Sequence, residues 1–437
     1  MRSHCIFLMK KIFAYITLSL PAALFILLWR IQPLGNGELS RSECPVKQKD
    51  IPIAAIPQPK KTPPEKQKAT KRVPLLPTKG LQTVACCPPS TCLDVQIWER
   101  NGQPGDKKAL LNAIARSLQY LQTGDAATVY KRYQVAGITR DRVIRSLKRF
   151  RELVLKSNSA AELQAAVNRE FIFYQSAGHD AKGSVLFTAY YEPIYTASRV
   201  RTAEYRYPIY RLPPDLESWP QPHPTREQLE GKDGLQFSKT RLRGLELFWL
   251  RSRMDAFIAQ IEGSARLELT DGSQTTVGYA GNTKYSYTSI GRELAEDGKL
   301  PLEGMTMPII LQYFNKHPLE LNTYLPRNRS FVFFQDNKGK PAMGSINVPV
   351  TAERSIATDK SLMPPGALAF IRTSIPFVNN SGKIEHRIVS RYVLDQDTGG
   401  AIKGAGRVDY FLGTGKQAGD RAGVTVSTGN LYYLLLK

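Results

Sequence analysis

The sequence predicts a mainly β fold with helices on its N-terminal side. From residue 185 onward, short runs of aromatic and β-branched residues are separated by Gly, Pro and Asp-Gly turn signals. Between residues 106 and 170, apolar residues recur at helical spacing instead. Many short strands with turn signals favour a barrel or a sandwich over a doubly wound sheet. The sequence contains no internal repeat, GxGxxG or P-loop motif, which argues against nucleotide chemistry.

Three helices are expected ahead of the β region. The first covers residues 106–122, where an apolar stripe ends at Leu121. Thr139 can cap the second helix, and Ser159 with Glu162 forms a capping-box pattern before the third. These stripes are assigned to the core and carry no functional role.

Strands and two further helices are expected in the rest of the chain. The strand patterns cover residues 185–191, 330–335, 367–374 and 387–394, with a hairpin turning at Asp271-Gly272. The helical patterns cover residues 245–262 and 307–316.

Charge is spread unevenly along the 437 residues. The formal net charge is +22, of which residues 1–90 carry +10, from fourteen basic and four acidic side chains. Such a chain suits a polyanionic partner, namely nucleic acid, anionic lipid or an acidic cell-wall polymer. It has no zinc-finger spacing and no basic heptad region, so we expect no nucleic-acid partner.

All the cysteines precede residue 93, at Cys5, Cys44, Cys86, Cys87 and Cys92. The folded body therefore offers no disulfide and no thiol nucleophile. A structural zinc site needs four ligands at regular spacing, and the last three cysteines have no fourth partner nearby. We expect no metal and no cofactor, and a disulfide between two of these three in an oxidising compartment.

The N-terminus has the pattern of a membrane address. Arg2, Lys10 and Lys11 precede an apolar run over residues 12–29, which as a helix spans about 27 Å, close to the hydrocarbon thickness of a bilayer. Residues 1–30 are thus a signal anchor or a cleaved signal peptide, with the rest of the chain exported. Residues 31–94, rich in Pro and Lys, are expected to form a disordered spacer.

The C-terminal segment 395–423 contains the most candidate functional residues. It combines Asp397, Lys403, Asp409 and Asp420 with eight glycines. Glycines at this density let a backbone approach a ligand or another backbone closely. Two interpretations follow from the residues alone, a ligand site or a string of turns with solvated aspartates.

The order of motifs resembles that of the MltA family of membrane-bound lytic murein transglycosylases. Asp-Thr-Gly-Gly-Ala-Ile-Lys-Gly at 397–404, Val-Asp-Tyr-Phe-Leu-Gly at 408–413 and Ala-Gly-Asp-Arg-Ala-Gly at 418–423 resemble the C-terminal three-aspartate segment of that family. Upstream matches occur in the same order at 186–193, 206–211, 255–264, 278–282, 287–292, 328–334 and 358–366. The resemblance covers roughly residues 180–437.

The resemblance implies a double-psi β-barrel that is interrupted in sequence by an inserted second β-domain, with a groove for the glycan between them. The barrel domain would then comprise residues 95–193, including the helical region, and residues 299–437. The insert would comprise residues 194–298.

The resemblance also implies the site residues. Asp409 corresponds to the catalytic acid and base, Asp397 to a supporting acid beside it, and Asp420 lies near the third family aspartate. Expected substrate contacts are Thr188, Tyr190, Tyr191, Glu192, Glu262 and Lys403. At Glu262 this chain departs from the family, which has Gln in Gln-Gly-Ser-Gly.

The implied reaction cleaves the bond between N-acetylmuramic acid and N-acetylglucosamine in peptidoglycan without water. The C6 hydroxyl of the muramic acid attacks its own C1 and closes a 1,6-anhydro ring. Since this nucleophile is intramolecular, one carboxyl can serve as acid and then as base. Expected partners are glycan strands and, through the N-terminal segment, the membrane of the bacterial envelope; we expect a monomer.

Two other functions fit parts of the sequence. Asp397-Thr398-Gly399 also matches an aspartic protease loop, but that chemistry needs two such loops and the chain has one. A non-catalytic carbohydrate-binding protein is the stronger alternative, because double-psi barrels also bind sugars and the basic tether would suit a wall-binding protein.

Overall fold

The computed structural model describes residues 76–78, 93–98, 104–133 and 135–437. The predicted anchor over 1–30, all five cysteines and most of the predicted spacer over 31–94 lie outside these residues. Within the described residues, no helix has both the length and the apolar content to cross a membrane.

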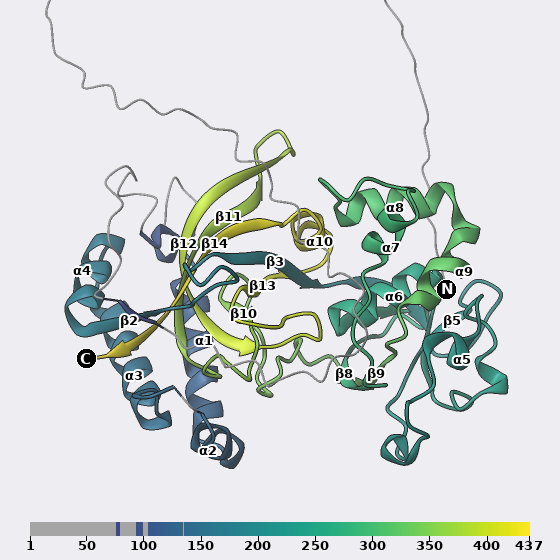
Figure 1. The fold of residues 1–437 in the computed structure, drawn as a ribbon, viewed down its shortest axis with the longest axis horizontal. Coiled ribbons are helices and arrows are strands. Elements are labelled where there is room, and N and C mark those ends of the chain that lie inside the picture. Colours follow the sequence, from purple (N-terminus) through teal and green to yellow (C-terminus); the bar gives the residue numbers. More distant parts are fainter. Residues whose placement is uncertain (1–75, 79–92, 99–103, 134) are drawn as a thin grey trace, which may run out of the picture. The chain divides into compact units, whose positions relative to one another are not determined.

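Four helices precede the β region, as Figure 1 shows. They are α1 (Lys107–Leu121), α2 (Gly124–Lys131), α3 (Arg140–Lys156) and α4 (Ala160–Glu170). Thr139 caps α3 by accepting a hydrogen bond from Arg142 N, and Ser159 caps α4 by accepting one from Glu162 N. The three predicted helices are confirmed, and α2 is an additional one.

Six strands close into a barrel. The first sheet contains β1 (Leu76–Thr78), β2 (Phe171–Gln175), β3 (Val185–Glu192), β10 (Ser355–Ala357), β11 (Leu368–Val378), β12 (Ile384–Asp397), β13 (Arg407–Thr414) and β14 (Ser427–Leu436). Its order is β1-β2-β14-β11-β12-β10-β13-β3, and an additional β14–β3 pairing closes the ring from β14 to β3. We identify this ring, with its parallel pairs β10–β12 and β13–β3, with the predicted double-psi barrel.

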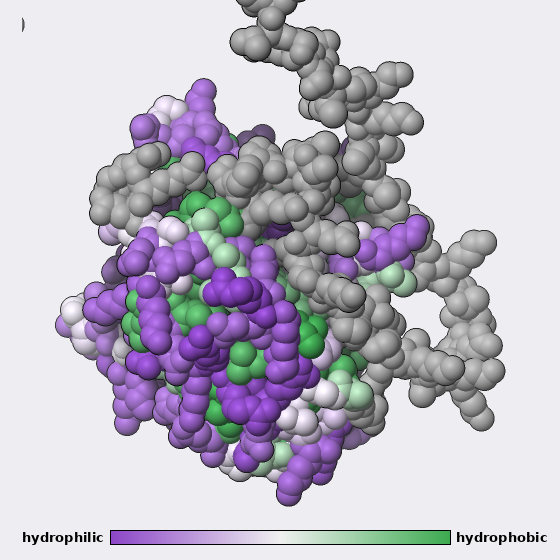
Figure 2. Space-filling model, turned by 90° about the vertical axis from the view of Figure 1, so that its left-hand side faces the viewer, coloured by the Kyte–Doolittle hydropathy of each residue, from purple (hydrophilic) through white to green (hydrophobic). Residues whose placement is uncertain are grey.

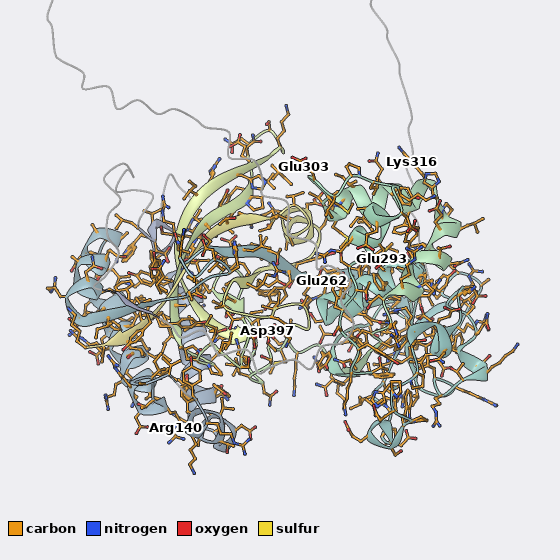
Figure 3. The ribbon with its side chains drawn as sticks, viewed as in Figure 1. Arg140, Glu262, Glu293, Glu303, Lys316 and Asp397 are labelled. Carbon is orange, nitrogen blue, oxygen red and sulfur yellow. The ribbon has the colours of Figure 1, made fainter. Side chains whose placement is uncertain are left out.

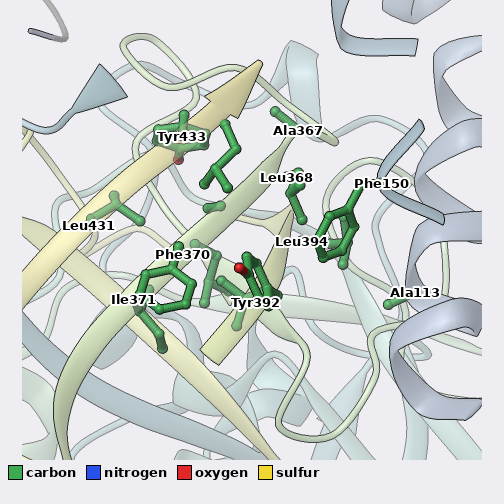
Figure 4. Packing of buried hydrophobic residues seen from close by; sticks show 14 of the residues in the cluster. Ala113, Phe150, Ala367, Leu368, Phe370, Ile371, Tyr392, Leu394, Leu431 and Tyr433 are labelled. Atoms are coloured by element: carbon green, nitrogen blue, oxygen red, sulfur yellow. The ribbon is translucent and has the colours of Figure 1, made fainter. Parts of the chain in front are cut away.

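The helices cover the outside of the barrel at one end and share its core. α1 lies against β12, while α3 lies against β11 and β14. Phe150 of α3 packs on Tyr392 with ring centroids 4.8 Å apart, and Phe370 packs on the same ring at 4.9 Å (Figure 4). Each such fully buried side chain contributes about 1.5–3 kcal/mol. The opposite, outward side of these helices is mostly hydrophilic (Figure 2).

A second sheet interrupts the barrel in sequence. Its strands are β4 (Ile194–Ser198), β5 (Tyr207–Tyr210), β6 (Glu246–Leu250), β7 (Ser264–Leu269), β8 (Gln274–Asn282) and β9 (Val332–Asp336), in the order β5-β6-β4-β7-β8-β9. The predicted hairpin at Asp271-Gly272 joins β7 and β8. Because β9 belongs to this sheet, the sheet extends past residue 298, where the sequence predicted the insert to end.

Short helices accompany both sheets. They are α5 (Arg226–Glu230), α6 (Arg253–Glu262), α7 (Ile290–Glu296), α8 (Met307–Lys316) and α9 (Leu321–Tyr324) around the second sheet, and α10 (Lys416–Ala422) beside the barrel. The prediction of α8 is confirmed. The single helix predicted over 245–262 is wrong, because its first part is the buried strand β6 and the helix begins only after the cap at Ser252. A short apolar run is consistent with either element.

A buried ion network ties the segment before α1 to the barrel. Arg354 is fully buried and donates to Asp94 at 2.5 Å and to Asp106 at 2.8 Å. Asp94 also accepts the backbone N–H of Tyr392 on β12 at 2.8 Å. Each charge in this network has a counter-ion, so removal of one leaves the others buried without compensation.

We therefore expect Arg354→Met to lower the free energy of unfolding by about 3–5 kcal/mol. The matched control is Arg251→Met, which breaks a half-exposed pair with Glu204 and should cost at most about 1 kcal/mol. Chemical denaturation of both variants measures the difference. Equal losses in the two variants would contradict a structural role for the network.

Candidate functional site

Both candidate aspartates lie in one row across the barrel. Ala357 on β10 is the register partner of Asp397 on β12 and of Asp409 on β13, and Asp409 in turn pairs with Thr188 on β3. Strands are spaced about 4.8 Å apart, so the two aspartates stand roughly 10 Å apart at their backbones. The small side chain of Ala357 between them leaves room for the carboxyls to approach.

The row faces away from the core. Along β13, Val408 and Tyr410 are fully buried in the core, whereas Arg407 and Asp409 are only partly buried. On β3, Thr188 alternates in the same way with the buried Phe187. Successive residues of a strand point to opposite faces, so Arg407, Asp409 and Thr188 share one accessible face, which we call the site face.

A β-bulge turns Asp397 toward the site face. Ile356 pairs with Asp395 and Ala357 pairs with Asp397, so Gln396 has no partner on β10. In a strand with regular alternation, Asp397 would point to the same side as the buried Asp395, two residues earlier, and the bulge breaks this alternation. Gln396 is itself held in the interior, where its side-chain amide donates to Ala113 O at 2.8 Å. Bulges that redirect a side chain are common beside active sites.

Asp409 is held in a way that favours its neutral form. Thr188 Oγ1 donates to Asp409 Oδ1 at 2.6 Å. Burial is the largest effect and raises the pKa of Asp409. The hydrogen bond from Thr188 and the charge of Arg407 lower it, and the negative charge of Asp397 raises it by a smaller amount. A carboxyl with this surrounding can hold a proton where an ordinary aspartate does not.

Asp397 accepts more hydrogen bonds from the protein than Asp409 does. It accepts hydrogen bonds from the Tyr190 hydroxyl at 2.8 Å, from Ser345 N at 2.8 Å and from Thr398 N at 2.8 Å. Burial raises its pKa, while these three donors and the charge of Lys360 act in the opposite direction. The larger number of donors favours the ionised form of Asp397 over that of Asp409.

Glu262 reaches the same site from the second β region. It ends α6, and its Oε2 accepts a hydrogen bond from Tyr191 N on β3 at 3.1 Å. Figure 3 shows Glu262 on the side of α6 that faces the barrel strands, with Asp397 at the end of β12. Burial raises the pKa of Glu262 to about 8, and the charge of Asp409 adds to this. At neutral pH it is therefore mainly a neutral carboxylic acid, which can donate and accept like an amide.

The remaining predicted site residues do not all lie beside Asp397 and Asp409. Glu192 is buried and pairs with Arg266 at 3.4 Å and Thr414 Oγ1 at 2.7 Å, which joins the two sheets. Lys403 is exposed in its turn. Asp420 is half exposed on α10, where it pairs with Lys416 at 2.6 Å and makes no hydrogen bond with Asp397 or Asp409.

Two charged residues near the site were not singled out by the sequence analysis. Arg407 lies on the site face beside Asp409, and Lys360 forms a very short pair with the fully buried Asp395. Lys360 also lowers the pKa of Asp397 by its charge. Strand alternation from Asp409 would have pointed to Arg407, whereas Lys360 is recognised only from the contacts. The described residues contain no cluster of three His, Cys, Asp or Glu suited to a metal ion.

Comparisons with known proteins agree with this geometry. The MltA specific insert domain matches residues 186–335, and the 3D domain matches residues 354–435. The chain is 34% identical to membrane-bound lytic murein transglycosylase A of Escherichia coli K12 over 263 residues, which is 60% of this chain and 68% of that protein. The chain belongs to the MltA family of lytic murein transglycosylases. The relative from Vibrio cholerae is 31% identical over 267 residues, with 60% and 68% covered.

Solved structures give the same assignment. E. coli MltA with bound chitohexaose has a TM-score of 0.61 at 26% identity, covering 83% of this chain and 95% of that one. A membrane-bound lytic murein transglycosylase from Agrobacterium tumefaciens has a TM-score of 0.59 at 28% identity, covering 76% and 93%. The predicted membership of the MltA family, and with it the enzyme class, is confirmed.

The raised pKa of Glu262 makes stability depend on pH. Between about pH 4.5 and pH 8 the unfolded chain releases this proton while the folded chain keeps it, so the wild type loses stability as pH rises through this window. Glu262→Gln has no such proton. We expect its melting temperature to match the wild type near pH 4.5 and to exceed it by a few degrees at pH 8. A difference that stays constant across the window would contradict the neutral state of Glu262.

Proposed function

We propose that this chain cleaves the β-1,4 bond between N-acetylmuramic acid and N-acetylglucosamine in peptidoglycan without water, with Asp409 as the single acid and base. The observation that supports this most is the buried Asp409 carboxyl on the site face, held by Thr188 beside the hydrogen-bonded Asp397. The related MltA structure that contains chitohexaose supports a glycan as ligand. Products would carry 1,6-anhydro-muramic acid ends.

In the first step, neutral Asp409 donates its proton to the oxygen that leaves with N-acetylglucosamine. Each unit by which the site raises the pKa of Asp409 destabilises the carboxylate by about 1.4 kcal/mol relative to the neutral acid. Burial and Asp397 supply this effect together. The bond from C1 to the leaving oxygen breaks, and positive charge develops at C1.

In the second step, the C6 hydroxyl of the same sugar attacks C1 and gives its proton to the Asp409 carboxylate. The acid is thereby regenerated, and the atoms of the products equal those of the substrate. Since the nucleophile is held on the reacting ring, positioning replaces the second catalytic carboxyl that a hydrolysing glycosidase uses. Ionised Asp397, held by Tyr190 and two backbone N–H groups, would stabilise the charge at C1.

The remaining contacts complete the proposed site. Neutral Glu262 would hydrogen-bond a sugar from the second β region, as the Gln of other family members would. Tyr190 packs on Phe411 with ring centroids 5.1 Å apart, so its role is to hold Asp397 rather than to stack on a sugar. We place the enzyme on the exported face of the bacterial envelope, tethered by its N-terminal segment. Its relatives in E. coli and Vibrio cholerae, which are membrane-bound lytic murein transglycosylases, support this location.

Replacement of Asp409 tests the proposal directly. Asp409→Asn should lower turnover of purified cell wall by about 10²–10⁴-fold, the usual contribution of a general acid and base. Mass spectrometry of the digest should show anhydro-muropeptides with the wild type. Asp420→Asn is the matched control and should retain activity, because its carboxyl pairs with Lys416 at the surface. Reducing ends in the digest would mean hydrolysis, and glycan binding without any product would select a wall-binding protein.

Replacement of Asp397 tests the partition of charge. The charge of Asp397 raises the pKa of Asp409, so Asp397→Asn should lower that pKa and move the alkaline limb of the rate profile to lower pH. Asp336→Asn, in β9 of the second sheet, is the control. An unchanged rate and pH profile in Asp397→Asn would exclude a supporting role for this residue.

A further inference from the structure

Arg407 is a cation on the site face, and the residues that the structure describes provide no anion within ion-pair distance of it. It stands two residues before Asp409 on β13, with Leu186 as its register partner on β3. One of its guanidinium nitrogens, Nη1, is buried and has no hydrogen-bond partner among the described residues. Burial lowers the pKa of Arg407, which is the effect of a guanidinium that has lost water without full compensation.

Two other acids of the barrel domain are already engaged. Asp359 accepts hydrogen bonds from Gly404 N at 2.8 Å and Ser361 N at 3.0 Å, and Asp395 pairs with Lys360. The charge of Arg407 lowers the pKa of Asp409, but the two side chains form no ion pair. A buried donor without a partner costs free energy. A ligand that supplied an acceptor to Nη1 would offset this cost.

The charge of Arg407 is also unfavourable for the proposed chemistry of the free enzyme. A cation beside Asp409 favours the carboxylate, whereas the first step needs the neutral acid. An anion bound to Arg407 would cancel this effect. Among the described residues, the charged and titratable groups that interact with Asp409 are Arg407 on β13, Asp397 on β12, Glu262 on α6 and Tyr190 on β3. Of these, Arg407 is the one whose charge lowers the pKa of Asp409.

We propose that Arg407 binds a carboxylate of the muramyl unit at which the glycan is cleaved. Arg407 would then be a specificity residue for anionic glycan. This rests on the proposed function. The planar guanidinium can take a carboxylate through two parallel N–H bonds. Two sources carry the same chemistry, the lactyl carboxylate of a peptide-free muramic acid and the free carboxylates of its stem peptide.

Arg407, rather than the expected substrate contact Lys403, would then bind the carboxylate of the substrate. Lys403 is exposed in the turn after β12, where a carboxylate would compete with water. Arg407 lies beside the reacting carboxyl, so the ligand it binds also sets the protonation of Asp409. The charge of Arg407 thus couples binding of the anionic sugar to protonation of Asp409.

Binding measurements in the Asp409→Asn background test this, because Asn keeps the neutral state and prevents turnover. Calorimetry would compare three ligands, namely neutral chitohexaose, peptide-free murein strands and peptide-bearing murein strands. Added Arg407→Met should weaken the anionic ligand by about tenfold or more, the usual effect of a lost hydrogen bond to a charged group. Chitohexaose binding should change by less than about twofold. The anionic ligand that is weakened identifies the carboxylate.

Two further variants make the result decisive. Arg407→Lys, which keeps the charge without the planar fork, should lose less affinity than Arg407→Met and covers the case in which the Met variant does not fold. Arg387→Met removes an exposed cation from β12 and should change none of the three affinities. Equal weakening of all three ligands by Arg407→Met, or of none, would overturn the inference. If the unmodified enzyme releases no anhydro product, the proposed function itself fails, whatever Arg407 binds.

Discussion

Two carboxyls meet on one face of the barrel because β12 carries one residue more than β10 opposite it. The extra residue, Gln396, is fixed in the interior by Ser355, Ala113 and Ser117. Its presence directs Asp395 into the core and Asp397 to the site face. The electrostatic arrangement follows from that geometry, since the charge of Asp397 helps to keep the proton on Asp409. The hydrogen bonds of Tyr190 and Thr188 then hold the two side chains in place.

The sequence was sufficient for the capped helices and for the central acids, but not for every helix boundary or for the way the segments are joined. Caps at Thr139 and Ser159 are local signals and were found correctly. The change from strand to helix at Ser252 was missed, because a buried strand and a buried helix turn have the same apolar composition. The motif match predicted Asp397 and Asp409, and the structure shows them in one row.

Other features of the site depend on contacts between distant segments, which a single sequence does not reveal. Asp420 lies in the same glycine-rich segment as Asp409, yet it belongs to α10 and pairs with Lys416. Glu192 follows two site residues in sequence, but burial makes it a link between the sheets. Arg407 has no motif of its own. Its proposed role follows from the absence of an acceptor around Nη1 within the part of the chain that the structure describes.

The interruption of the barrel affects when the site can form. Thr188 and Asp409 are 221 residues apart in sequence and adjacent in space, and closure of the ring also requires β14, the last strand of the chain. A chain that emerges N-terminus first presents β3 long before its partners β13 and β14 arrive, and such non-local pairing is slow to form. A chain that has not yet reached β13 thus lacks the pair of Thr188 and Asp409. The row of site residues would form only after β13 and β14 have emerged and paired with β3.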